Sequence, residues 1–81
     1  MIQKFPEVKK SQVAIVRVDV NTGHILDDQF NLATNINQKV YTIFEDIDSA
    51  IRFAKSIVQE RRDIECNLYG EQMKFLQRIS K

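Results

Sequence analysis

His24, Asp27 and Asp28 are the residues whose types and spacing come nearest to a metal site or a general acid–base pair. Histidine titrates near neutral pH, and imidazole and carboxylate groups are common metal ligands. A metal site needs three or four converging ligands, however, and a His-x-x-Asp pair supplies two at most. A nucleophilic mechanism would need a serine or cysteine brought in from elsewhere. We therefore interpret His24 as a surface residue that follows a turn.

Two further groups of reactive residue types have simpler structural explanations. Cys66 is the only cysteine of the chain, and it falls on the apolar side of an alternating segment, where free cysteine packs as a small hydrophobic residue. Glu45, Asp46 and Asp48 form an acidic cluster that could hold Mg²⁺. Asp46 and Asp48 also suit the N-cap and first turn of a helix, where negative charge is favourable. We expect structural roles for both groups.

No catalytic or nucleotide-binding motif is present. The chain lacks the Walker, GxGxxG, HExxH, CxxC and GxSxG patterns. Because its glycines are Gly23 and Gly70 alone, no glycine-rich loop can surround a phosphate. We therefore predict that the protein is not an enzyme and that it uses no metal or cofactor.

A single helix is predicted immediately after residues 39–45. Its apolar residues recur at intervals of three and four, which places them on one helical face. These residues are Ile47, Ala50, Ile51, Ala54, Ile57 and Val58. Asp46 is the expected N-cap, while Arg61 and Arg62 lie near the negative end of the helix dipole.

Five strands are predicted around this helix. Alternating apolar residues and flanking turn residues place them at residues 12–20, 24–30, 39–45, 63–69 and 73–79. The order β-β-β-α-β-β, with a short connection at each end, favours antiparallel hairpins. The expected fold class is therefore α+β, an antiparallel sheet of about five strands with one helix packed on one face.

The sequence predicts the inward-facing side chains for one of the next two strands and leaves two alternatives for the other. In residues 39–45, either Val40, Thr42 and Phe44 or Tyr41 and Ile43 could face the helix, because a one-residue slip inverts every side chain. In residues 73–79, the alternation predicts Met73, Phe75 and Ile79 on the inner face.

Length, composition and charge indicate one ordinary globular domain. The 81 residues suffice for a single domain over residues 1–81, with residues 1–10 as a flexible or partly docked N-terminal arm. A net charge of +1 provides no general attraction for nucleic acids or anionic membranes. The single cysteine and the absence of a signal-like or membrane-spanning segment lead us to expect a cytoplasmic protein.

A candidate partner surface follows from the geometry of the expected sheet. Five strands about 4.8 Å apart span about 19 Å, whereas one helix covers only about 10–12 Å. The face turned away from the helix is expected to carry apolar, aromatic and basic side chains. Its candidate residues are Ile15, Arg17, Tyr41, Ile43, Asn67, Tyr69, Lys74, Leu76 and Arg78.

The residues of this face are compatible with three interpretations. A partly solvated antiparallel sheet with mixed side chains is common. Apolar and aromatic groups on a nearly neutral face favour an interaction module that binds a protein partner or a second copy of the chain, through this face or an edge strand. The alternative is a nucleic-acid-binding accessory domain that uses Arg17, Tyr69, Lys74 and Arg78.

Overall fold

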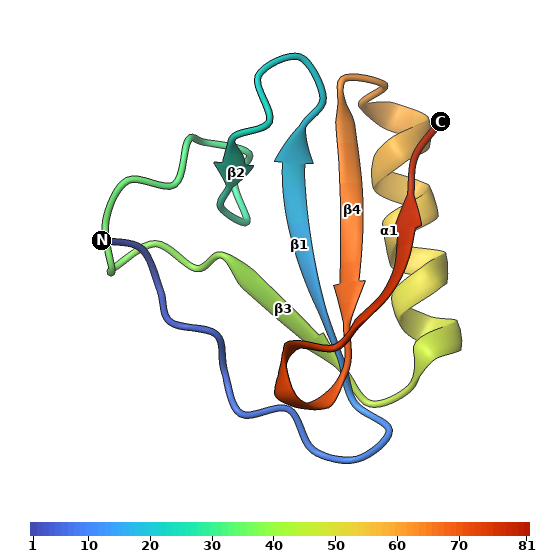
Figure 1. The fold of residues 1–81 in the computed structure, drawn as a ribbon. Coiled ribbons are helices and arrows are strands. Elements are labelled where there is room, and N and C mark those ends of the chain that lie inside the picture. The colour runs from blue at the N-terminus through green and yellow to red at the C-terminus, as the bar shows by residue number, and fades with distance from the viewer.

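The computed structural model describes residues 1–81 and shows an α+β fold, in which one helix packs on an open five-stranded antiparallel sheet (Figure 1). The strand–helix order is the predicted one. The elements are β1 (Val13–Asp19), β2 (Ile25–Leu26), β3 (Tyr41–Phe44), α1 (Ile47–Glu60), β4 (Ile64–Tyr69), the 3₁₀ turn η1 (Glu71–Met73) and β5 (Phe75–Ile79). Neither α1 nor the 3₁₀ turn has the length and hydrophobicity of a membrane-spanning helix.

The sheet is four strands wide at any level, although it contains five strands. β4 pairs with one side of β1, and β5 pairs with β4. β2 and β3 pair with successive parts of β1 on its other side, so they lie end to end along one edge (Figure 1). Three strand spacings of about 4.8 Å give a width of about 14 Å. The expected width of about 19 Å was therefore wrong, because the chain leaves and rejoins the same edge between β2 and β3.

The helix begins and ends close to the predicted residues. Asp46 is the N-cap, and its carboxylate accepts a hydrogen bond from the Ser49 N–H at 2.8 Å. Hydrogen bonds from the backbone and hydroxyl of Ser49 lower the pKa of the Asp46 carboxyl below its ordinary value. The last turn closes where the N–H of Arg61 donates to the Ile57 carbonyl. The buried residues of α1 all belong to the predicted apolar stripe, and they are Ala50, Ala54, Ile57 and Val58.

The main core lies between α1 and one face of the sheet. Val13 and Ile15 of β1 meet Ile64, Cys66 and Leu68 of β4 in this layer. The structure also shows which side chains of β3 face the helix. Thr42 and Phe44 face the helix, since the ring of Phe44 lies 4.9 Å from that of Phe53 on α1, centroid to centroid.

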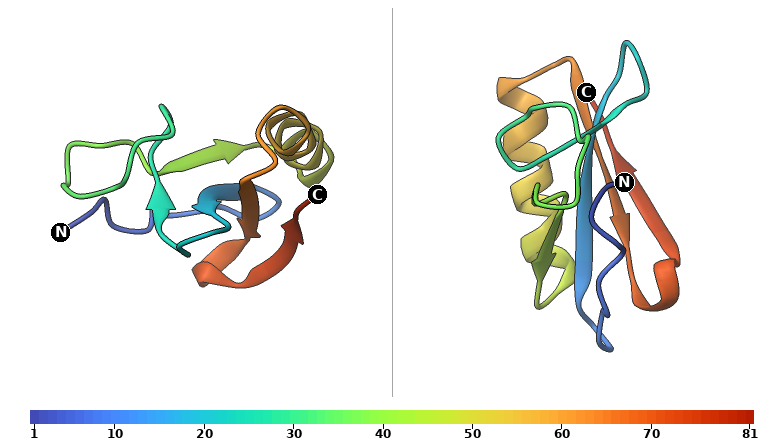
Figure 2. Two further views of the ribbon diagram at one scale, coloured as in Figure 1. Left: turned by 90° about the horizontal axis from the view of Figure 1, so that it is seen from above. Right: turned by 90° about the vertical axis from the view of Figure 1, so that its left-hand side faces the viewer.

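The N-terminal arm, residues 1–10, lies along the sheet face opposite α1 (Figure 2). Its Phe5 ring meets Tyr41 and Tyr69 edge-on, with centroid separations of 5.2 and 6.0 Å. The side-chain oxygen of Gln3 accepts hydrogen bonds from the N–H groups of Val40 and Tyr41 at 2.8 and 3.3 Å. Val8 is buried. The arm therefore covers part of the sheet that the helix leaves open.

The predicted second strand, residues 24–30, was too long. Regular pairing stops at Leu26, because the Asp27 carboxylate turns the chain back on itself. One oxygen of Asp27 accepts from the N–H groups of Gln29 and Asn31, both at 2.9 Å, and the other accepts from the Gln38 amide at 2.7 Å. Such side-chain-to-backbone bonds compete with strand pairing.

The inward assignment of Met73 and Phe75 was also wrong. Met73 is 55% exposed and Phe75 is 51% exposed, whereas Ile79 is buried as predicted. The chain passes through positive φ at Gln72 and Met73, and the β4–β5 register then shifts between Leu68 and Tyr69. Each irregularity breaks the simple alternation on which the assignment depended.

Candidate functional site

Ile15 and Arg17 do not lie on a free sheet face, so their assignment to an outward surface was wrong. They are 0% and 1% exposed and lie on the helix-covered side of β1. Because β1 is buried on both faces, alternation alone could not show which face meets the helix. Arg17 is accommodated by neutral acceptors, since its Nε donates to the Asp27 carbonyl at 3.1 Å and its Nη1 to the Thr42 hydroxyl at 3.0 Å.

Tyr41, Asn67 and Tyr69 are on the face opposite the helix, as expected, but they are only half exposed. Phe5 packs against both tyrosines, and Tyr69 also meets the Phe75 ring edge-on at 5.8 Å. Burial is the main cause that raises the pKa of the Tyr41 hydroxyl, and Tyr69 adds to it. The rings of Tyr41 and Tyr69 therefore form a second, smaller core with Phe5 under the arm instead of an open platform.

The remaining candidates are exposed, and three of the four gather at one edge of the sheet. Ile43, 39% exposed, stands alone on β3 at the other edge. Lys74 lies between η1 and β5, and Leu76 and Arg78 lie on β5. Leu76 is 38% exposed, and the side chain of Arg78 reaches Glu65 at 3.8 Å.

Met73 and Phe75, which were predicted to face inward, lie beside these residues and are exposed. Together with Lys74, Leu76 and Arg78 they make up what we call the β5 surface, which spans both faces of the edge strand. Phe75 packs on Tyr69 on the face opposite α1, whereas Leu76 lies over Gly70 in a pocket with Val13 and Ile47 on the helix side, so its outward assignment was wrong. No sequence signal marks the positive φ of Gln72 and Met73, which turns the beginning of β5 outward. Glycine or asparagine would be the usual sign of such a backbone conformation.

β5 is the free edge of the sheet. Its residues make backbone hydrogen bonds to β4 alone, so one side of its backbone has no partner. The opposite edge is closed in part by the chain itself. Gln3 accepts from Tyr41 N–H of β3, and Ala33 N–H donates to the Ile25 carbonyl of β2 at 3.0 Å. An unpaired strand edge is a template for another strand.

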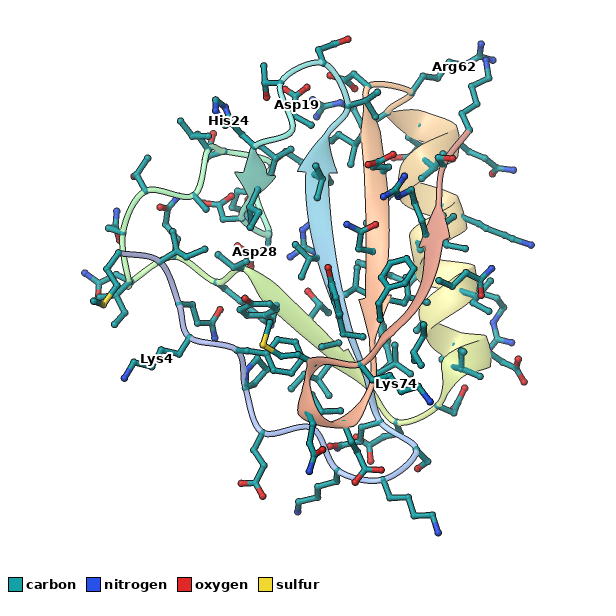
Figure 3. The ribbon with its side chains drawn as sticks, viewed as in Figure 1. Lys4, Asp19, His24, Asp28, Arg62 and Lys74 are labelled. Carbon is teal, nitrogen blue, oxygen red and sulfur yellow. The ribbon has the colours of Figure 1, made fainter.

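Basic side chains flank this edge at both ends. Arg62 lies near the C-terminus, and Lys74 lies toward the opposite end of β5 (Figure 3). A groove of 370 Å³ between α1 and β5 has no acidic residue in its lining. The residues that line it are Lys55, Val58, Gln59, Arg62, Arg78, Ile79, Ser80 and Lys81. The end of the edge near the C-terminus is therefore bordered by positive charge, whereas Asp46 and Glu71 lie beside Lys74 and Leu76 at the other end.

The reactive residue types of the sequence do not converge. His24 is exposed in the turn before β2, and Figure 3 shows it well apart from Asp28. No group of three His, Cys, Asp or Glu side chains is arranged to hold a metal ion. Burial raises the pKa of the Cys66 thiol to about 11, which agrees with its predicted role in the core. A thiol with such a pKa is a poor nucleophile at neutral pH.

Comparison with protein-family models, curated proteins and solved structures finds no match to this chain. Its function must therefore be inferred from the side chains and backbone groups described above.

Proposed function

We propose that this protein is a non-enzymatic interaction module that binds an extended segment of another protein along β5. The observation that carries the proposal is an unpaired strand edge bordered by exposed Met73, Phe75 and Leu76. A partner strand would gain main-chain hydrogen bonds from the edge, and its alternate side chains would contact these apolar groups. Exposed apolar side chains grouped in this way favour a protein partner over plain solvation.

The charges around β5 indicate the chemistry of the partner segment. Lys74 and Arg78 on the β5 surface, with Lys55, Arg62 and Lys81 in the adjoining groove, present five cations. Glu65 pairs with Arg78 and offsets one of them, and Asp46 and Glu71 line the pocket beside Lys74, so the excess of cations lies at the groove between α1 and β5. A segment that combines apolar residues with aspartate or glutamate would be complementary to this arrangement.

The two other candidates fit the β5 surface less well. Pairing of β5 with a second copy would bring two sets of Lys74 and Arg78 to one interface, where like charges repel. A nucleic-acid surface would lack Arg17, which is buried, and Tyr69, which is packed between Phe5 and Phe75. Phe75 is then the one exposed aromatic ring of the β5 surface on which a base could stack, whereas single strands are bound through several such rings.

A peptide-display selection against the full chain tests the proposal. The selected peptides should be rich in acidic and apolar residues, and their binding should weaken as salt rises. Phe75→Ser and Lys74→Glu should each reduce binding of a selected peptide, measured by fluorescence anisotropy. Ile43→Ser is the matched control, because it removes a similarly exposed apolar strand residue from the other edge.

Amide hydrogen exchange locates the contact. Binding should slow exchange in Phe75–Ile79 and leave the β2–β3 edge unchanged. Peptides without acidic residues, equal effects of Ile43→Ser and Phe75→Ser, or protection away from β5 would each refute the proposal. A concentration-dependent dimer that Phe75→Ser abolishes would replace the partner with a second copy.

A further inference from the structure

A second feature of the molecule, on the other edge of the sheet, is a pocket of 590 Å³ between α1, β3 and the loop after β2. Its volume lies within the range of about 300–1,000 Å³ that is usual for small-molecule sites. The residues that line it are Arg17, Asp28, Phe30, Lys39, Thr42, Phe53, Ser56, Ile57, Glu60 and Arg61. It shares none of these residues with the β5 surface.

Arg17 is the most deeply buried charged residue in this lining. It is 1% exposed, yet it forms no ion pair, since its hydrogen bonds go to a carbonyl and a hydroxyl. Its Nη2 group is buried and has no hydrogen-bond partner. The carboxylate of Asp27 does not pair with Arg17. It accepts hydrogen bonds from Gln29, Asn31 and Gln38 instead. The Asp28 and Asp27 carboxylates stabilise the charge of Arg17, but neither forms an ion pair with it. Burial of this cation is therefore costly, and a complementary anion in direct contact with it would be favoured.

The free N–H groups of Arg17 determine the shape of that anion. Two of the five N–H donors, one on Nε and one on Nη1, are already in use. The remaining donors on Nη1 and Nη2 form the planar end of the guanidinium, which matches the two oxygens of a carboxylate. Because Nη2 is covered, a carboxylate reaches it only by displacing the flexible side chains of the lining.

The rest of the lining determines the charge and body of the ligand. The lining carries Arg17, Lys39 and Arg61 against Asp28 and Glu60, but Arg61 is paired with Asp63 at 3.5 Å, so the remaining charges balance. Such a lining accepts a single negative charge at Arg17 more easily than a phosphate dianion, which the two carboxylates would repel. The rings of Phe30 and Phe53 supply apolar walls. The Phe30 ring is held by the guanidinium of Arg61, which lies 5.1 Å from its centroid.

From this arrangement we infer that the pocket binds a small organic monocarboxylate with an aromatic or apolar body. The carboxylate pairs with the Nη1–Nη2 end of Arg17, and the body packs between Phe30 and Phe53. The site is independent of the β5 surface, so either proposal can fail while the other stands.

Benzoate is the probe, with benzamide as its neutral isostere and inorganic phosphate as the competing anion. In ¹⁵N-detected NMR titrations of the full chain, benzoate should shift the Arg17 side-chain Nε–H and the backbone amides near Phe30 and Ser56. Benzamide and phosphate should not produce these shifts. Equal binding of benzamide would show that the guanidinium is not used, and preferential binding of phosphate would overturn the carboxylate assignment.

Two charge reversals separate a specific site from a general charge effect. Lys39→Glu and Arg62→Glu change the net charge equally, but only Lys39 lines this pocket. Lys39→Glu should weaken benzoate binding about tenfold, and Arg62→Glu should leave it unchanged. Arg17→Met should abolish binding, with circular dichroism to verify that the variant folds. Equal losses in the two Glu variants, or no benzoate shift at millimolar concentration, would refute the inference.

Discussion

Removal of the Phe5 ring should release the N-terminal arm from the sheet. Phe5 makes edge-on contacts with Tyr41 and Tyr69, at centroid separations of 5.2 and 6.0 Å. Each aromatic pair contributes about 0.5–1.5 kcal/mol beyond the burial of its surface. Phe5→Ala should therefore lower the free energy of unfolding by at least about 1–3 kcal/mol, because the lost burial of the ring adds to the two pair contributions. A domain of this length has a total stability of about 4–12 kcal/mol, so the loss is a sizeable fraction of it.

Urea denaturation followed by circular dichroism measures this loss. Lys4→Ala is the control, because Lys4 is a neighbour in the arm and its side chain extends into solvent (Figure 3). Hydrogen exchange adds a local readout, since the Val40 and Tyr41 amides donate to Gln3 of the arm. Both amides should exchange faster in Phe5→Ala. A change in unfolding free energy below about 0.5 kcal/mol, with both amides still protected, would show that the arm does not close this face.

Three further predictions concern the turn, the helix cap and the thiol. Gly23 has φ +76° and open space around the position of a Cβ. Gly23→Ala should therefore cost about 1 kcal/mol of conformational strain, and Gly23→Asn should cost less. Equal urea midpoints for all three proteins would contradict this prediction. Asp46→Ala should destabilise the helix at neutral pH. The folded pKa of Asp46 is lowered, so its contribution is complete above the unfolded value of about 3.9 and disappears as pH falls below it. Thermal unfolding should show that the difference in stability between Asp46→Ala and the wild-type protein shrinks as the pH falls below this value. Cys66 should resist a thiol reagent at pH 8 in the native protein and react on unfolding; rapid labelling of the native protein would show that it is accessible.

Local sequence determined the elements of this fold well. The spacing of three and four residues in Ile47–Glu60 and the carboxylate of Asp46 define a helix without reference to the rest of the chain. The alternation of Ile64, Cys66 and Leu68 likewise marks a strand with one buried face. These signals depend on contacts within a few residues, so they can be read from the sequence alone.

The positions of the functional candidates were decided by tertiary structure. Ile15 and Arg17 belong to a strand buried on both faces, so only the packing of α1 shows which side each occupies. Arg17 is tolerated inside because the Asp27 carbonyl and the Thr42 hydroxyl, distant in sequence, meet its guanidinium. The exposure of Phe75 follows from positive φ at Gln72 and Met73, which neither residue type indicates.

The sequence by itself determined the order of the helix and strands and the bounds of α1 and β4 to within a residue or two, and it showed no motif for catalysis. Only the tertiary structure decided that β2 and β3 share one edge, that the arm covers Tyr41 and Tyr69, and that β5 is left unpaired. The physical reason is the range of the interactions. Helix caps and alternation act between near neighbours, whereas the choice of a buried face or a free edge depends on the packing of the whole chain.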